Sequence, residues 1–294
     1  MAAGQPEAAS GALMHAGHGM GTPSGPGADL PLLLPWGLLL AAAMLYGGLA
    51  TRQVRAGRGW PAARSIWFAL GSLLLAVAFS PALTELAHAD VRAHMAQHLL
   101  TGMFAPLALA LAWPLTLLLR NLPVQLARRL MGWLHAPPLR LLTSPVTALL
   151  LNVGGLSLLY LTPLYALMLH RPLVHGLVQF HVFAAGLLYT VVVAGIEPVV
   201  ARAPFALRVA VLLLGTAAHA TLAKLLYAGW WPHGTGNPPG QLQQAAKLMY
   251  SWGDLAEMLL AVLVFWGWYV RRGRAQARAR GSAGQNRAVT SPGR

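Results

Sequence analysis

The chain of 294 residues contains no cysteine. That absence excludes disulfide bonds, thiolate metal sites and cysteine nucleophiles. Acidic residues are scarce as well, with seven Asp and Glu against 21 Lys and Arg, and the sequence has no motif for nucleotide binding, phosphate binding or a hydrolytic triad. A soft metal ion bound by this protein would therefore have to use methionine sulfur or histidine nitrogen. We predict that the protein is not an enzyme.

Apolar sequence, by contrast, is abundant. Hydrophobic residues make up 56% of the chain, charged residues 10%, and the mean hydropathy is +0.56, which is unlike an ordinary soluble domain. A membrane helix needs about 20 apolar residues. Seven stretches are long enough, at approximately 30–50, 65–87, 92–119, 145–163, 173–195, 206–228 and 249–270. We predict an all-α, polytopic membrane protein with seven transmembrane helices in residues 30–272, between disordered tails at 1–29 and 273–294.

Proline should interrupt two of these helices. Pro81 lies inside the second stretch, and Pro106 and Pro114 lie inside the third. A proline inside a helix removes one backbone hydrogen bond and clashes with the preceding turn. We therefore expect breaks or kinks there, with Gly102 helping Pro106 to bend the third helix.

The distribution of charge predicts an orientation. The net charge of +14 could indicate a nucleic-acid partner, but the sequence has neither an aromatic-basic recognition module nor zinc-finger spacing. Alternate loops instead hold seventeen basic residues on one side of the membrane and four on the other, namely Arg92, Arg171, Lys224 and Lys247. Basic loops stay in the cytoplasm, so we predict an outer N-terminus, an inner C-terminus and contact with lipid but not with nucleic acid. No basic segment precedes the first apolar stretch, so we expect no cleaved signal peptide.

Ten of the eleven histidines fall on the outer side of this topology, and only His135 falls on the inner side. His94 and His98 are four residues apart, so their rings leave one helix face. From the helical rise, His181 and His219 lie roughly 12 and 13 Å below the outer surface. A histidine at membrane depth is costly unless it has a partner, so each is a candidate functional residue.

We expect these side chains to share one outward-opening pocket that binds copper. The predicted metal ligands are His94, His98, His181 and His219, with Met95, His88 and His175 nearby and Met14, His15, His18 and Met20 as a capture arm in the N-terminal tail. Gln97, Asp254 and Glu257 would not bind the ion themselves but would hydrogen-bond to its ligands and orient them. Two alternatives remain open. His181 and His219 could clamp a haem iron, or the histidines could be hydrogen-bonded ties between helices.

Three segments resemble the CtaG-type cytochrome c oxidase assembly factors. The first runs His94-Met95-Ala96-Gln97-His98-Leu99-Leu100 and continues through Ala105-Pro106 to Trp113-Pro114, with Trp113 where a glycine is usual. The second runs from Tyr160 to Pro198, with Tyr165, His170, Pro172, His175, His181, Gly186 and Glu197 in the family's order. The third, from Gln243 to Tyr250, departs from the family pattern, with Gln243 in place of an acid, Lys247 in place of a glycine and Tyr250 in place of a tryptophan. The similarity as a whole spans roughly residues 35–270 and leaves both tails uncovered.

This resemblance implies a seven-helix protein of the bacterial inner membrane that helps to mature a haem-copper oxidase. It implies partners among the oxidase subunits, subunit I or II, and periplasmic copper chaperones, with copper supplied to an outer centre. A haem-binding redox protein, a non-metal scaffold for oxidase subunits and a general copper-transport protein remain as alternatives. If the carboxylate missing at Gln243 has a role in the family, Asp254 is the residue that would replace it.

Overall fold

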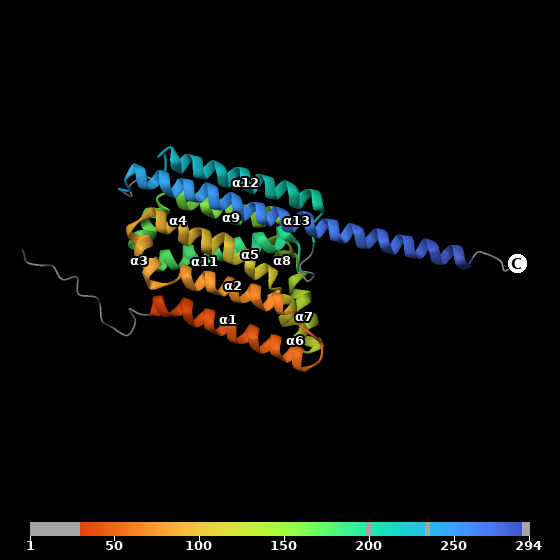
Figure 1. Cartoon of the computed structure of the whole chain (residues 1–294). Coiled ribbons are helices and arrows are strands. Elements are labelled where there is room, and N and C mark those ends of the chain that lie inside the picture. The colour runs from red at the N-terminus through yellow and green to blue at the C-terminus, as the bar shows by residue number, and fades with distance from the viewer. Residues whose placement is uncertain (1–29, 198–201, 233–235, 290–294) are drawn as a thin grey trace, which may run out of the picture.

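The computed structural model describes residues 30–197, 202–232 and 236–289, and in these ranges every regular element is a helix. The longer helices lie side by side along one direction (Figure 1). The prediction of an all-α fold is confirmed. The N-terminal tail, with Met14, His15, His18 and Met20, lies outside the described residues, as do residues 290–294.

Four helices are by themselves long and apolar enough to cross a membrane. They are α1 (Leu30–Arg55), α11 (Pro172–Ala194), α12 (Phe205–Tyr227) and α13 (Pro239–Val289). Three bent pairs pass the same test when each pair is joined, which gives between four and seven candidate spans in the described part of the chain. These helices fit a multi-pass membrane protein, and each of the seven predicted stretches overlaps one helix or one bent pair.

The bent pairs follow the prolines in two cases. Helix α2 (Ala62–Ala78) meets α3 (Pro81–Ala89) at 50°, and α5 (Ala105–Leu111) is followed at 42° by α6 (Pro114–Asn121). Pro81 and Pro114 each begin the second helix of a pair, where the missing N–H costs nothing. The third pair, α9 (Pro145–Leu161) and α10 (Leu164–His170), bends by 77° around Pro163.

Pro106 has a different effect from the predicted kink. The chain from α4 (Val91–Leu99) to α5 passes through a π-helix, η1 (Leu100–Phe104), and continues without a sharp bend. Pro106 has no N–H to donate to the carbonyl of Gly102 four residues earlier. The wider π turn takes up this irregularity, and such turns are frequent at functional sites.

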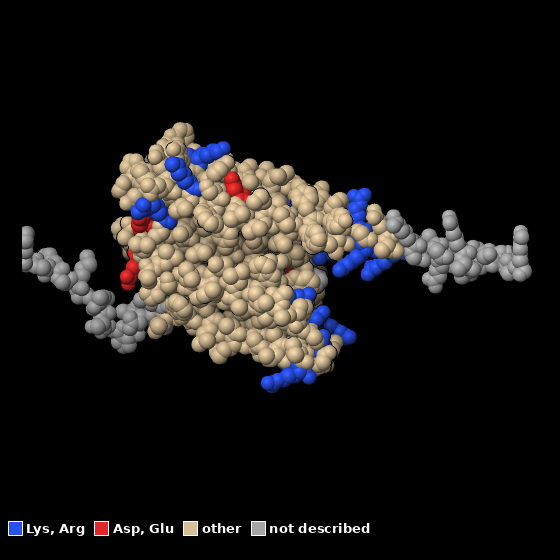
Figure 2. All heavy atoms as spheres, viewed as in Figure 1, with Lys and Arg blue, Asp and Glu red and all other residues tan. Residues whose placement is uncertain are grey.

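One end of the bundle is rich in arginine, and we call it the Arg-rich end. It carries the C-terminus of α1, helices α6, α7 (Val124–Leu134) and α8 (Pro137–Leu142), and the point where α13 leaves the bundle (Figures 1 and 2). The short helices α7 and α8 lie in what the sequence predicts as a loop. Helix α13 also continues to Val289, whereas the sequence predicts a disordered tail from residue 273. This extension is rich in Ala and Arg, which are strong helix formers.

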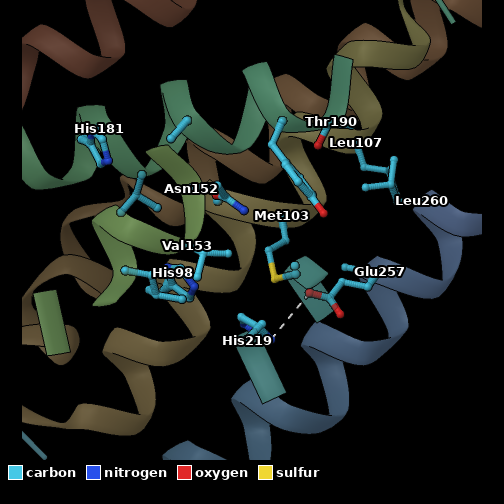
Figure 3. A pocket seen from close by; sticks show the side chains of 17 residues that line it. His98, Met103, Leu107, Asn152, Val153, His181, Thr190, His219, Glu257 and Leu260 are labelled. Carbon is cyan, nitrogen blue, oxygen red and sulfur yellow. Dashed lines mark ion pairs between the residues drawn. The ribbon is translucent and has the colours of Figure 1, made fainter. Parts of the chain in front are cut away.

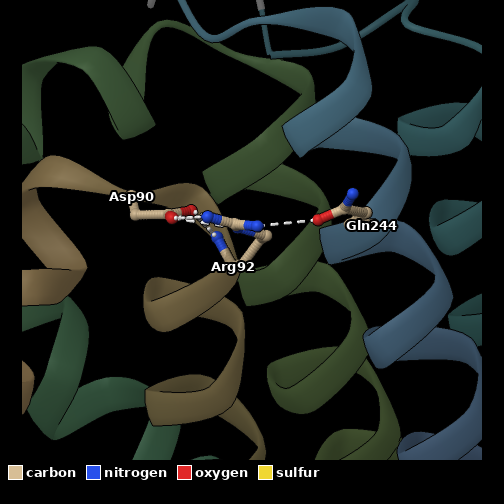
Figure 4. A network of polar contacts seen from close by, with 3 residues as sticks. All are labelled: Asp90, Arg92 and Gln244. Atoms are coloured by element: carbon tan, nitrogen blue, oxygen red, sulfur yellow. Dashed lines mark hydrogen bonds and ion pairs between the residues drawn. The ribbon is translucent and has the colours of Figure 1, made fainter.

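The opposite end carries charges of both signs (Figure 2). There the guanidinium of Arg92 donates to Asp90 at 2.9 Å and to the amide oxygen of Gln244 at 2.8 Å (Figure 4). This network joins the start of α4 to the start of α13. We call this end of the bundle its mouth, and the network fixes it next to the helices that carry the histidines.

Candidate functional site

A small cavity lies inside the bundle, near the middle of helices α9, α11 and α12. Its lining includes His98 of α4, Met103 of η1, His181 of α11, His219 of α12 and Glu257 of α13 (Figure 3). The space measures about 40 Å³. A water molecule needs about 10–15 Å³ on this measure. The cavity therefore has room for an ion with a few small ligands but not for a large molecule. A haem bound between His181 and His219 would need a far larger slot.

The imidazoles of His98 and His219 lack hydrogen-bond partners. Both side chains are buried, with 8% and 5% of their surface exposed, and all four ring nitrogens are without a partner in the described structure. The nearest carboxylate to His219 is Glu257, whose Oε1 lies 3.9 Å from Nδ1. An unsatisfied buried polar group costs about 1–3 kcal/mol. These rings are therefore suited to bind something that enters the cavity.

Two glycines make room for histidine rings at this site. A Cβ at Gly253 would collide with the ring of His219, and a Cβ at Gly155 would collide with the ring of His181. His181 already has one partner, because its Nε2 lies 3.1 Å from the carbonyl oxygen of Leu151. The positions of both rings thus depend on small residues on neighbouring helices, α13 and α9.

The π turn shapes the wall of the cavity. It places Met103, five residues after His98, against the same space (Figure 3). In a regular α-helix a residue five positions later would point about 140° away. Helix α11 packs closely on this turn, because a Cβ at Gly186 would collide with the carbonyl of Gly102.

His94 lies in a different environment from His98, although they are one turn apart. Its ring is 3% exposed and packs edge-on against Tyr165, with centroids 4.9 Å apart, and against Tyr160 at 6.3 Å. His94 Nε2 has no hydrogen-bond partner. The ring does not line the cavity. The structure therefore separates the pair that the sequence places together.

His88 and His175 form a pair of their own near the mouth of the bundle. His88 Nε2 lies 3.2 Å from His175 Nδ1, and the two rings meet edge to face. His88 is exposed and His175 is partly exposed. This pair, like His94, lies outside the lining of the cavity.

Of the other described residues predicted to belong to the site, one lines the cavity and the rest lie elsewhere. Glu257 lines the cavity, but Asp254 does not. Met95 is fully buried in a hydrophobic cluster with Tyr160. Gln97 is also buried, and its amide is used between helices: Nε2 donates to the carbonyl of Ala78 at 2.7 Å, and Oε1 accepts from Gln179 at 2.8 Å.

The donor set fits a metal ion only in part. Imidazole nitrogen and thioether sulfur together suit copper, and the unpartnered nitrogens of His98 and His219 are available. However, no three His, Asp or Glu side chains in the described ranges stand close enough together to hold an ion. A bound ion would need Met103 as a ligand or a rotation of side chains. Sequence reasoning missed Met103, since only the π turn brings it to the cavity, and it missed Asn152 and Thr190, which also line it.

The architecture defines the class of the protein: it is an all-helical protein with several helices able to span a membrane and a small histidine-lined cavity between them. The chain belongs to the cytochrome c oxidase caa3 assembly factor family, whose sequence profile matches residues 44–271. This match confirms the family resemblance of the three motifs.

Curated relatives come from mycobacteria. Uncharacterized proteins of Mycobacterium bovis and Mycobacterium tuberculosis are each 31% identical over 191 residues, and one of Mycobacterium leprae is 30% identical over 176 residues. The matches cover 63% and 58% of this chain but only 29% and 27% of those relatives. The chain thus spans less than a third of their length. No solved structure matches it significantly.

Proposed function

We propose that this protein carries copper as cargo during assembly of a haem-copper oxidase. The observation that carries the proposal is the pair of buried imidazoles, His98 and His219. Their ring nitrogens have no hydrogen-bond partner, and they line one cavity with the thioether of Met103. His181 and Glu257 would complete the surroundings of the ion. Because the ion is cargo, an incomplete set of ligands favours its release to a client.

The proposal extends to topology. The seven candidate spans would all cross the bacterial inner membrane, with the Arg-rich end in the cytoplasm. The His88–His175 pair would then lie on the periplasmic side, with the cavity deeper in the membrane. From there copper would pass to subunit I or II of the oxidase, and periplasmic copper chaperones would supply it. Met14, His15, His18 and Met20 would act as a capture arm for copper.

The test is metal analysis of detergent-purified protein after loading with Cu(I). We expect the wild-type protein to retain copper and the double variant His98→Ala/His219→Ala to lose at least nine-tenths of it. His170→Ala is the matched control, because His170 is exposed and lies outside the cavity. Equal copper in the wild-type protein and the double variant would disprove the proposal, provided that circular dichroism shows both to be folded.

A non-metal scaffold for oxidase subunits is the second candidate. It is favoured by the absence of a convergent three-ligand cluster in the described ranges. Oxidase assembly in cells that carry only the double variant separates the two functions. If the oxidase from these cells is fully active and contains its full copper, the scaffold function is supported. If the oxidase is folded but lacks copper, copper delivery is supported.

A further inference from the structure

A large hollow lies at the Arg-rich end, far from the histidine cavity. It measures about 780 Å³ and is lined by residues from α1, α6, α7 and the adjoining loops. Four of them are arginines: Arg52, Arg58, Arg120 and Arg128. Nothing in the copper proposal uses this hollow.

Specific contacts hold α1 against α6 beside the hollow. Gln53, 1% exposed, donates from Nε2 to the carbonyl of Arg120 at 3.1 Å. Asn121, itself part of the lining, donates from Nδ2 to the carbonyl of Leu49 at 3.3 Å. These bonds fix the angle between the helices. The arginines therefore surround a formed concave surface.

The four arginines have no acidic counterpart. No Asp or Glu is among the lining residues. In the described ranges, the two ion pairs formed by side chains are Arg92–Asp90 and His219–Glu257, and neither reaches the hollow. Uncompensated guanidinium groups around a concave surface attract phosphate, which they bind through paired N–H donors.

Helix α7 forms one wall and explains what kind of phosphate compound would fit. It is strongly amphipathic and buries no residue against the rest of the protein. Its apolar side chains are open to the surroundings: Val124 is 65% exposed, Leu126 48% and Trp133 71%. A short helix of this kind, with tryptophan and arginine, is typical of the interface between lipid headgroups and acyl chains.

We propose that this hollow binds the headgroup of an anionic phospholipid. The arginines would hold its phosphate, and the apolar side of α7 would lie against its acyl chains. Basic pockets between membrane helices are suited to such headgroups. A soluble phosphate compound would make the same contacts with arginine, but it would leave the apolar side chains of α7 exposed.

The hollow allows a closely matched pair of double variants. Arg58→Gln/Arg128→Gln removes two lining arginines, and Arg55→Gln/Arg129→Gln removes two that lie outside the lining on the same segments. Both variants lose the same charge. The full chain in detergent is mixed with dioleoyl phosphatidylglycerol or dioleoyl phosphatidylcholine, and native mass spectrometry measures the lipid that stays bound.

We expect the wild-type protein and the control variant to retain phosphatidylglycerol over phosphatidylcholine, and Arg58→Gln/Arg128→Gln to bind it about tenfold more weakly or worse. An equal loss in both variants would mean general charge attraction and would overturn the proposal. Displacement of the lipid by an excess of inorganic phosphate would also overturn it, in favour of a soluble ligand. Equal thermal midpoints of the two variants establish that folding is not the cause.

Discussion

The side chain of Gln179 on α11 donates a hydrogen bond of 2.8 Å to Gln97 on α4. Gln97 in turn donates to the carbonyl of Ala78 at the end of α2. Both glutamines are buried, with 6% and 1% exposed. The two bonds connect α2, α4 and α11 at the residue next to His98, so Gln97 acts on the position of α4 and, through it, on His98.

Breaking this chain of hydrogen bonds should lower stability in a non-additive way. Gln97→Leu strands the amide of Gln179 and the carbonyl of Ala78, and we expect a cost of about 1–3 kcal/mol. The double variant Gln97→Leu/Gln179→Leu removes both ends of one bond and should cost less than the sum of the two single changes. Thermal unfolding in detergent measures all four proteins. Strict additivity would mean that the two amides are not coupled.

The glycine at position 253 should be necessary for metal retention. Gly253→Ala forces the ring of His219 to move, and Gly155→Ala does the same to His181. We expect the first to lower bound copper at least fivefold and the second to have a smaller effect, since His181 is already bonded to Leu151. Gly154→Ala is the control, because a Cβ there meets open space. If all three variants hold as much copper as the wild-type protein, the position of His219 is irrelevant to binding.

Trp113 adopts a conformation that glycine prefers. Its φ is +54°, and its ring lies 3.8 Å from the guanidinium carbon of Arg64. Alanine at this position loses the cation–π contact and keeps the left-handed backbone, which costs about 1–2 kcal/mol. Glycine loses the contact but relieves the backbone, at an unfolded-state cost of about 0.4–1 kcal/mol. We expect Trp113→Gly to unfold at a higher temperature than Trp113→Ala, and the reverse order would show that no backbone strain exists here.

Glu197 should make stability depend on pH. It follows α11, outside the spanning helices, and it is buried while its Oε1 accepts a hydrogen bond from the backbone N–H of Thr116. Burial raises the pKa of this carboxyl above its usual 4.5, and the bonds from Thr116 oppose that rise without cancelling it. A raised pKa in an acid means that its contribution to stability is full below pH 4.5 and is lost as pH rises through the folded-state pKa.

The matched variant for this test is Glu197→Gln, which keeps an oxygen acceptor for Thr116 and carries no charge. We expect the thermal midpoint of the wild-type protein to fall relative to this variant as pH rises from 4.5. Glu85→Gln, at an exposed position, is the control substitution of the same kind. Parallel curves for the wild-type protein and Glu197→Gln would show that the carboxyl has the same pKa in the folded and unfolded chain.

The sequence was sufficient for the helices because their signals are local. Runs of about 20 apolar residues and prolines at Pro81 and Pro114 mark the long helices and two of the bends. Pro106 marks an irregularity after His98, but the sequence does not show that it is taken up as a π turn, since that depends on how α11 packs through Gly186 against the carbonyl of Gly102. Helix α7 was missed because it has too few apolar residues to span a membrane and is amphipathic instead.

The site was predicted less completely than the fold. The i,i+4 spacing of His94 and His98 places both rings on one face, but it cannot say which neighbours fill the space between them. Tyr165 packs on His94, while the cavity lies at His98.

Arg208 gives a similar lesson. Its sequence context suggests a surface charge, yet it is 1% exposed and donates to the carbonyls of Val193 and Ala194, which the end of α11 leaves without helical partners.

Helix α13 is one continuous element from the mouth of the bundle to well beyond the Arg-rich end (Figure 1). Its 51 residues span about 76 Å, more than twice the thickness of a hydrocarbon layer. The same helix carries Gly253 and Glu257 in its first half and a run of arginines from Arg271 onward. A tilt of the C-terminal part of this helix would therefore be passed along it to Gly253, where the backbone lies against the ring of His219. A proline inserted near residue 275 would sever that linkage and leave the cavity itself untouched.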